Sequence, residues 1–321
     1  MSTPRRKSLT GTTHDQSTAN GAARAVAAVE RGIEGTVDLL YRAPLWLPNR
    51  HVQTIIPSLF GRRPAIAFRR ERWDTPDGDF LDLDWVVHDG QPASALSPPS
   101  VPRAPADDAP LLVLFHGLEG SSASHYAATL MAAAREYGWH GVVPHFRSCS
   151  GSLNLLPRFY HLADSNEVDW ILRRLRGTHR GPIVAAGVSL GGNVLLRWLG
   201  ERREDAVPVL SAAAAISTPI DVHAGGRALS QGFNMVYTRS FLKTLKQKAE
   251  QKLLQFPGLF DRDAMLASRT MYDFDNVVTA PLHGFRDTNH YWSTATTRPL
   301  LHGIAVPTLV LNARNDPFLP A

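Results

Sequence analysis

Short apolar runs alternate with helix-competent stretches through the middle of this 321-residue chain. The apolar runs that read as strands cover residues 111–115, 141–144, 182–186, 209–216 and 308–312. Helical spacing predicts helices over residues 124–137, 165–175 and 192–199. Strands that alternate with helices need crossover connections, and short apolar runs of this kind are buried on both faces of a parallel sheet. The sequence therefore predicts an α/β fold with a mostly parallel, doubly wound sheet.

The chain divides into four predicted parts. Residues 1–43 form a flexible N-terminal extension with one helix over residues 22–40. Residues 44–216 form the core, in which an N-terminal strand pair precedes a Pro-rich linker. Residues 217–305 are far longer than an ordinary crossover, so we interpret them as an inserted helical cap. Residues 306–321 return to the core with a strand and a loop that carries an acid.

One helix of the cap is predicted to be amphipathic, with a basic outer face. Its apolar residues are Phe241, Leu242, Leu245, Leu253 and Leu254, and its basic residues are Lys243, Lys246, Lys248 and Lys252. A solvated face is the usual meaning of such lysines, and peripheral contact with anionic membrane lipid is the alternative.

Composition excludes several classes of protein. A hydrophobic content of 44% and a charged content of 20% support a buried core. The single cysteine, Cys149, excludes an internal disulfide framework and a cysteine-based metal cluster, so we expect no metal site of this kind and no redox chemistry. The net charge of +5 is dispersed apart from Arg5, Arg6 and Lys7, which argues against a nucleic-acid partner. No apolar run approaches the ~20 residues of a membrane span and no signal-peptide pattern occurs, so we expect a cytoplasmic protein.

The strongest motif is G-V-S-L-G at residues 187–191, which has the form G-x-S-x-G between a predicted strand and a predicted helix. A sharp strand-to-helix turn crowds its own backbone, so both flanking positions must lack side chains, and the turn projects Ser189 outward. The following helix directs free N–H groups and the positive end of its dipole toward this serine. A serine in an ordinary turn is the alternative, but the flanking strand and helix favour a nucleophile for acyl transfer.

A second motif, H-G-L-E-G at residues 116–120, follows the strand at residues 111–115. In the α/β-hydrolase fold this turn supplies half of the oxyanion hole, a pair of backbone N–H groups that bind the negative oxygen of the tetrahedral intermediate. We expect the backbone N–H groups of Leu118 and Leu190 to form this hole. His116 is interpreted as a residue that fixes the loop rather than as the catalytic base.

An aspartate, Asp316, lies just past the strand at residues 308–312, where this fold carries the acid that orients a catalytic histidine. The fold's chain order is serine, acid and then histidine, but no histidine follows Asp316. His283, His290 and His302 precede it, and a displaced base among them is the weaker alternative. We therefore expect a fragment, a truncated gene product or a pseudoenzyme that lacks the final strand, the final helix and the catalytic histidine, with little or no esterase activity.

Five segments carry a resemblance to a known family: WLPNRHVQT at 46–54, HGLEGSSASHY at 116–126, HFRSCSGSLNLLPRFYH at 145–161, GVSLGGN at 187–193 and TAPLHGF at 279–285. Together they resemble the YheT-like family of α/β-hydrolases, bacterial relatives of the ABHD1- and ABHD3-type esterases, from residue 44 to the end. Two departures are that Ser148 stands where the family usually has glycine, and that the family's C-terminal histidine is absent. Residues that match family positions without an assigned catalytic role are interpreted as packing or loop-fixing: His51, Gln53, Arg147 and His161.

The resemblance implies an esterase that acts on short- or medium-chain acyl esters or acylglycerols through Ser, Asp and His without a cofactor. The predicted function is therefore a serine carboxylester hydrolase that works through an acyl-enzyme at Ser189. A noncatalytic binding protein and an acyltransferase are the alternatives. Acyl chain length, the alcohol of the substrate and the oligomeric state stay open.

Overall fold

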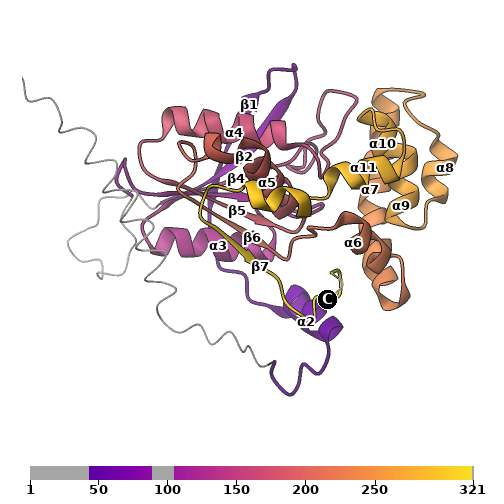
Figure 1. The fold of residues 1–321 in the computed structure, drawn as a ribbon, viewed down its shortest axis with the longest axis horizontal. Helices are drawn as coiled ribbons and strands as arrows, with labels where there is room; N and C mark the ends of the chain where they lie inside the picture. The colour runs from indigo at the N-terminus through magenta and orange to yellow at the C-terminus, as the bar shows by residue number, and fades with distance from the viewer. Residues whose placement is uncertain (1–42, 89–104, 320–321) are drawn as a thin grey trace, which may run out of the picture. The chain divides into compact units, whose positions relative to one another are not determined.

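Figure 1 shows the fold in a computed structural model, which describes residues 43–88 and 105–319. The described residues form a seven-stranded sheet in the order β1-β2-β4-β3-β5-β6-β7. The strands are β1 (Phe68–Asp74), β2 (Phe80–Val86), β3 (Leu111–Phe115), β4 (His140–Pro144), β5 (Ile183–Val188), β6 (Ala212–Ile216) and β7 (Thr308–Leu311). Both pairings of β2 are antiparallel, and all pairings from β4 to β7 are parallel. The predicted mostly parallel sheet is confirmed, whereas the helix predicted over residues 22–40 lies outside the described residues.

Helices cover both faces of this sheet, with α3 (His125–Glu136) on one face and α4 (Ser165–Thr178) and α5 (Leu190–Arg202) on the other (Figure 1). The residues of β3 show why, because successive side chains of a strand point to opposite faces. Val113 packs in a cluster with Leu172 and Leu195 of α4 and α5, whereas Leu114 packs in a cluster with Met131 of α3. An entirely apolar strand is therefore buried on both faces, as the sequence predicts.

The described residues between β6 and β7 form helices and loops without a strand. Figure 1 shows most of them gathered to one side of the sheet, whereas residues 298–303 lie against α5. The helices are α6 (Val222–Leu229), η2 (Gly232–Asn234), α7 (Met235–Gln255), α8 (Arg262–Ala267), α9 (Met271–Phe274), the π-helix η3 (Asp275–Thr279), α10 (Ala280–Leu282), α11 (Thr288–Ala295) and η4 (Arg298–Gly303). We call this helical segment the cap. Across the part of the chain that the structure describes, no helix is both long enough and apolar enough to cross a membrane.

The lysines of α7 correct the prediction of a basic outer face. Lys252 is fully buried, and its Nζ donates to two backbone carbonyl oxygens of the core at 2.7 and 2.9 Å. Lys246 donates to two carbonyl oxygens within the cap, and Lys248 pairs with a carboxylate of the core. Lys243 is exposed, while the apolar Leu254 is itself 84% exposed. The prediction is wrong because most of these lysines bind acceptors from loops that are distant in sequence.

A helix that the sequence analysis missed, α2 (Arg50–Phe60), precedes the sheet. Pro57 lies inside it, and a proline usually argues against a helix. The missed signal is Asn49, whose side chain accepts hydrogen bonds from the N–H groups of His51 and Val52 and so caps the helix start.

Candidate active site

The backbone turns sharply at Ser189, between β5 and α5. Ser189 has φ 54° and ψ −114°, and non-glycine residues rarely adopt a positive φ. A Cβ added to Gly191 would lie 2.2 Å from the carbonyl oxygen of Phe115, and one added to Gly187 would lie 2.5 Å from that of Gly191. Both positions therefore require glycine. Gly187 meets the backbone of its own turn, as predicted, whereas Gly191 meets the end of the neighbouring strand β3.

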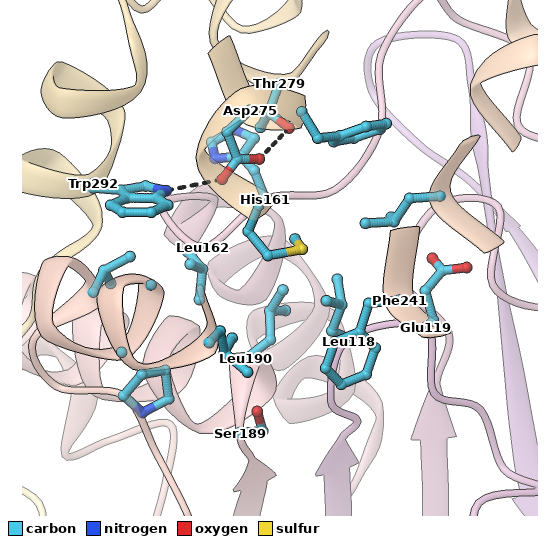
Figure 2. A pocket seen from close by; sticks show the side chains of 18 of the residues that line it. Leu118, Glu119, His161, Leu162, Ser189, Leu190, Phe241, Asp275, Thr279 and Trp292 are labelled. Carbon is cyan, nitrogen blue, oxygen red and sulfur yellow. Dashed lines mark hydrogen bonds between the residues drawn. The ribbon is translucent and has the colours of Figure 1, made fainter. Parts of the chain in front are cut away.

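Ser189 is half-buried and lines a cavity whose walls come from both the core and the cap. Figure 2 shows Ser189 at one end of this cavity, with Leu118 and Leu190 beside it. The wall is mostly apolar, and its aromatic residues are Phe159, Tyr160, Phe241, Phe274, Tyr291, Trp292 and Phe318. An apolar cavity with a hydroxyl at one end is suited to bind an acyl chain.

The two amides predicted to form an oxyanion hole follow adjacent strands, because β3 and β5 pair in parallel. A Cβ added to Gly117 would lie 3.4 Å from Cβ of Ser189, so the turn after β3 is in contact with the serine. Leu190 is the first residue of α5, where an N–H group has no acceptor within the helix. Within the described ranges, the N–H groups of Leu118 and Leu190 donate no hydrogen bond to the protein. Both remain available to a ligand.

A network that the sequence analysis missed holds the turn that carries Leu118. The next residue, Glu119, has φ 56°, and its N–H donates to the hydroxyl of Tyr160 at 2.8 Å. That hydroxyl donates to Oε1 of Glu119, also at 2.8 Å. Lys248 from α7 donates to the same oxygen at 2.8 Å and to Sγ of Cys149 at 3.4 Å. The hydrogen bond from Lys248 to Glu119 thus joins the cap directly to the turn. These two residues are 129 positions apart, so the sequence gives no sign of the contact.

His116 uses both nitrogens of its ring within the core. Nδ1 donates to the carbonyl oxygen of Gly117 at 2.8 Å, and Nε2 accepts from the N–H of Phe146 at 3.0 Å. Burial lowers the pKa of His116 to about 3, which keeps the ring neutral. These contacts confirm the prediction that His116 fixes the loop.

Asp316 lies on the loop after β7 and is 8% exposed. Burial raises the pKa of Asp316, while hydrogen bonds from the N–H of Phe318 and from Ser217 oppose this rise. Because β6 separates β5 from β7, Asp316 and Ser189 lie beyond the carboxyl ends of strands that are second neighbours in the sheet. Phe318 and Leu319 line the cavity, whereas Asp316 does not.

Among the described residues, no histidine hydrogen-bonds to Ser189 or Asp316. His283 packs against His161 with ring centroids 4.2 Å apart. His290 accepts a backbone hydrogen bond within the cap, and His302 is exposed on η4. The described part of the chain likewise holds no cluster of His, Cys, Asp and Glu arranged to bind a metal ion.

Two of the family-matched residues connect α2 to the region around Asp316. Nδ1 of His51 lies 3.3 Å from the hydroxyl of Tyr237, and Oε1 of Gln53 accepts from Nδ2 of Asn315 at 2.8 Å. Both side chains make packing or loop contacts, as predicted.

The other two family-matched residues lie in the core. Arg147 donates to Asp79 at 2.8 Å and to Glu167 at 2.6 Å, within a buried ion-pair network. Nδ1 of His161 accepts from the N–H of Ala163 at 3.2 Å, and burial lowers the pKa of His161 to about 3. Arg147 is a loop-fixing residue, whereas His161 both fixes a loop and lines the cavity.

Comparison with known proteins agrees with this fold. The family model for the alpha/beta hydrolase fold matches residues 110–321. The YheT protein of Escherichia coli is 40% identical over 274 residues, which cover 84% of this chain and 76% of YheT.

Two eukaryotic relatives are similar over a smaller share of their length. Mouse phospholipase ABHD3 is 28% identical over 283 residues, which cover 88% of this chain and 66% of the phospholipase. The monoacylglycerol lipase of Saccharomyces cerevisiae is 26% identical over 239 residues, which cover 69% of this chain and 51% of the lipase. The chain therefore spans two-thirds or less of these lipases. On its fold, its serine turn and its identity to YheT, the chain belongs to the α/β-hydrolase fold family and, within it, to the group that contains YheT.

Proposed function

We propose that this protein is a serine carboxylester hydrolase in which Ser189 attacks the carbonyl carbon of an acyl ester. The observation that carries the proposal is the turn at Ser189, where a positive φ and two obligatory glycines present a hydroxyl to an apolar cavity. The family consists of hydrolases of esterase and lipase type. Relatives named phospholipase and monoacylglycerol lipase support acyl esters, including acylglycerols, as the substrate class.

In the proposed reaction, Oγ of Ser189 forms a bond to the carbonyl carbon while its proton passes to a base. The N–H groups of Leu118 and Leu190 bind the resulting oxyanion, and one such donor typically contributes about 3 kcal/mol to the transition state. Collapse of the intermediate breaks the bond to the alcohol, which leaves with the proton from the base. Water then attacks the acyl-enzyme, gives a proton to the base and releases the carboxylic acid, and Ser189 regains its proton.

Asp316 is the proposed acid that orients and stabilises an imidazolium base. Among the described residues no histidine hydrogen-bonds to Ser189, so a base supplied from solution is the way to test the proposed proton transfer. Imidazole in solution has the pKa and chemistry of the histidine side chain, so it is a suitable replacement for the base.

Hydrolysis of p-nitrophenyl butyrate and octanoate by the full chain, measured over a series of imidazole concentrations, tests the proposal. Ser189→Ala is the matched control. The rate measured with this variant gives the hydrolysis caused by imidazole alone, which is subtracted from the wild-type rate. We expect slow hydrolysis without imidazole and a Ser189-dependent increase of at least about tenfold with it. Equal rates for the wild-type and Ser189→Ala chains at every imidazole concentration would overturn the proposal.

A noncatalytic binding protein is the second candidate, because the apolar cavity could hold an acyl ester whether or not Ser189 reacts. This candidate predicts that acyl esters bind in the cavity but that imidazole produces no hydrolysis dependent on Ser189. Calorimetric titration with a slowly hydrolysed ester, combined with the imidazole series, separates the two candidates.

A further inference from the structure

Asp275 lies in the cap, far from Ser189 in sequence, yet it lines the same cavity. It begins the π-helix η3, and such irregular turns often occur at functional positions. Asp275 is 7% exposed, and in the described residues its carboxylate forms no ion pair. A buried carboxylate without a cation is costly, so its position in a cavity wall calls for an explanation.

The hydrogen bonds of Asp275 leave part of its carboxylate unused. Oδ1 accepts from the hydroxyl of Thr279 at 2.6 Å, and Oδ2 accepts from Nε1 of Trp292 at 2.8 Å. An ionised carboxylate has about four acceptor sites, so each oxygen has capacity for a further donor. Thr279 opens the TAPLHGF segment, which the proposed ester chemistry does not otherwise use.

The other charged residues of the cavity wall neutralise each other or are neutral. Glu119 and Lys248 form an ion pair with a distance of 2.8 Å. Burial lowers the pKa of His161 to about 3, so this ring is uncharged near neutral pH. Among the described lining residues, Asp275 is therefore the one carboxylate that no protein cation balances.

Figure 2 shows where this carboxylate lies relative to the proposed nucleophile. Asp275 and Ser189 lie at opposite ends of the drawn cavity, and apolar side chains such as Leu118, Leu162 and Leu190 lie between them. A ligand that spans the cavity thus meets a hydroxyl at one end, apolar side chains along its length and a carboxylate at the other end.

We propose that Asp275 binds a hydrogen-bond donor, a hydroxyl or an ammonium group, at the end of the substrate remote from its scissile ester. The proposal rests on the proposed function for the placement of the ester at Ser189. It adds a specificity: esters with a polar donor at the far end bind better than plain alkyl esters. A plain alkyl end would displace water from the carboxylate without donating a hydrogen bond in its place. A binding site with such an acceptor therefore binds analogues that lack the donor more weakly.

Four methyl esters of equal chain length, bound to the full chain carrying Ser189→Ala, test this proposal without any ester chemistry. They are methyl octanoate, its 8-hydroxy and 8-ammonio derivatives and its 8-methoxy derivative, which has an oxygen but no donor. Isothermal titration calorimetry gives each Kd, and the same series at six and ten carbons covers other spans. We expect the hydroxy or ammonio ester to bind about 10- to 100-fold more tightly than the methoxy and plain esters at one of these lengths. The tighter of the two identifies the donor.

Asp275→Asn is the matched variant. Its amide can keep both hydrogen bonds, since its oxygen accepts from Trp292 and its NH2 group donates to the hydroxyl of Thr279. We expect this variant to lose the preference for donor-ended esters and to bind methyl octanoate at least as tightly as the chain with Asp275 does, because the charge that an alkyl end would desolvate is gone.

Equal affinity for all four esters at every length would overturn the proposal, and so would a preference that persists in Asp275→Asn. The ligand series in the Ser189→Ala chain decides the question even if Asp275→Asn does not fold. Because no hydrolysis is measured, a failure here is distinct from a failure of Ser189 to react.

Discussion

Two buried carboxylates, Asp84 in β2 and Asp275 in the cap, have opposite surroundings. Asp84 accepts two hydrogen bonds from Arg70 at 2.7 and 2.9 Å, one from Ser122 at 2.5 Å and one from His145 at 2.8 Å. Burial alone would raise the pKa of Asp84, but these partners hold it well below its usual value. Asp275 has only neutral donors, and burial raises its pKa to about 6.

The comparison separates two kinds of buried carboxylate: one that holds strands and loops together through charged donors, and one that lines a cavity without a protein cation. Around Asp84, the protein supplies four donors, one to Oδ1 and three to Oδ2, so the carboxylate ties β1, β2 and the loop after β4 together. Around Asp275, acceptor sites remain on the cavity side. The two groups must also influence stability with opposite dependence on pH.

Removal of the charge of Asp84 should have the largest effect on stability. Asp84→Asn leaves Arg70 and His145 without their buried anion, and we expect a loss of about 3–5 kcal/mol in the free energy of unfolding near neutral pH. Urea unfolding monitored by circular dichroism measures it, with the exposed Asp263→Asn as the control. Because the folded pKa of Asp84 is lowered, this contribution exists above the unfolded pKa and is lost as pH falls below it, so the difference should shrink in acid. If Asp84→Asn lost less than about 1 kcal/mol in the free energy of unfolding, the charged partners of Asp84 would not stabilise the fold, and the contrast with Asp275 would fail.

Removal of the charge of Asp275 should instead stabilise the protein at high pH. The folded pKa of about 6 lies above the unfolded value, so folding takes up a proton between them and stability falls as pH rises through that range. Asp275→Asn lacks this penalty. We expect the variant to equal the wild type near pH 4 and to exceed it by on the order of 3 kcal/mol near pH 8. Chemical unfolding of both chains at each pH checks this, and a variant that is less stable than the wild type at the higher pH contradicts it.

Lys248→Met tests what happens when a paired carboxylate loses its cation. Glu119 would keep the hydroxyl of Tyr160 but would lose Lys248, and so would resemble Asp275. We expect a loss of about 2 kcal/mol, since the broken hydrogen bond joins two charged and largely buried groups. Thermal and urea unfolding measure it, with Lys243→Met on the exposed side of the same helix as the control. Equal stability of the two variants would show that the ion pair contributes nothing.

The smallest effect is expected for Arg70→Lys, which keeps the charge beside Asp84 but loses the two-pronged contact. Arg70 has a side chain that is 44% exposed, so solvent screens the pair and we expect a loss of about 1 kcal/mol or less. Urea unfolding compared with Arg69→Lys, on a side chain that is 65% exposed, provides the measurement. A loss as large as that of Asp84→Asn would mean that Arg70, rather than the whole set of partners, holds the carboxylate.

The sheet was predictable because its signals are local. The run at residues 111–115 is apolar over its whole length, and the run at residues 308–312 is apolar at its centre, so β3 and β7 coincide with these runs within a residue. β3 is buried on both faces as predicted, whereas Leu309, Val310 and Leu311 of β7 are exposed. The turn at Ser189 was predictable because its motif lies within five consecutive residues, although one of its glycines, Gly191, relieves a clash with the distant Phe115.

The cavity wall was not predictable because its contacts are distant in sequence. Lys248 and Glu119 are 129 residues apart, and Lys252 reaches carbonyl oxygens 96 and 98 residues away. A helical pattern of lysines cannot show such acceptors, which is why the basic outer face was predicted wrongly. Asp275 carries no local signal either, because its role depends on which side chains of the cap surround it.

The most direct test of the central claim is whether Ser189 is the residue that reacts with an electrophile that imitates an acyl ester. The full chain is incubated with an alkyl fluorophosphonate, with and without imidazole, and the adduct is located by peptide mass spectrometry. We predict one adduct on the peptide that contains Ser189, faster with imidazole, absent in Ser189→Ala and strongly reduced in Gly191→Ala, whose Cβ would lie 2.2 Å from a backbone oxygen. A chain that stays unlabelled in imidazole, or that is labelled equally in Ser189→Ala, would contradict the account.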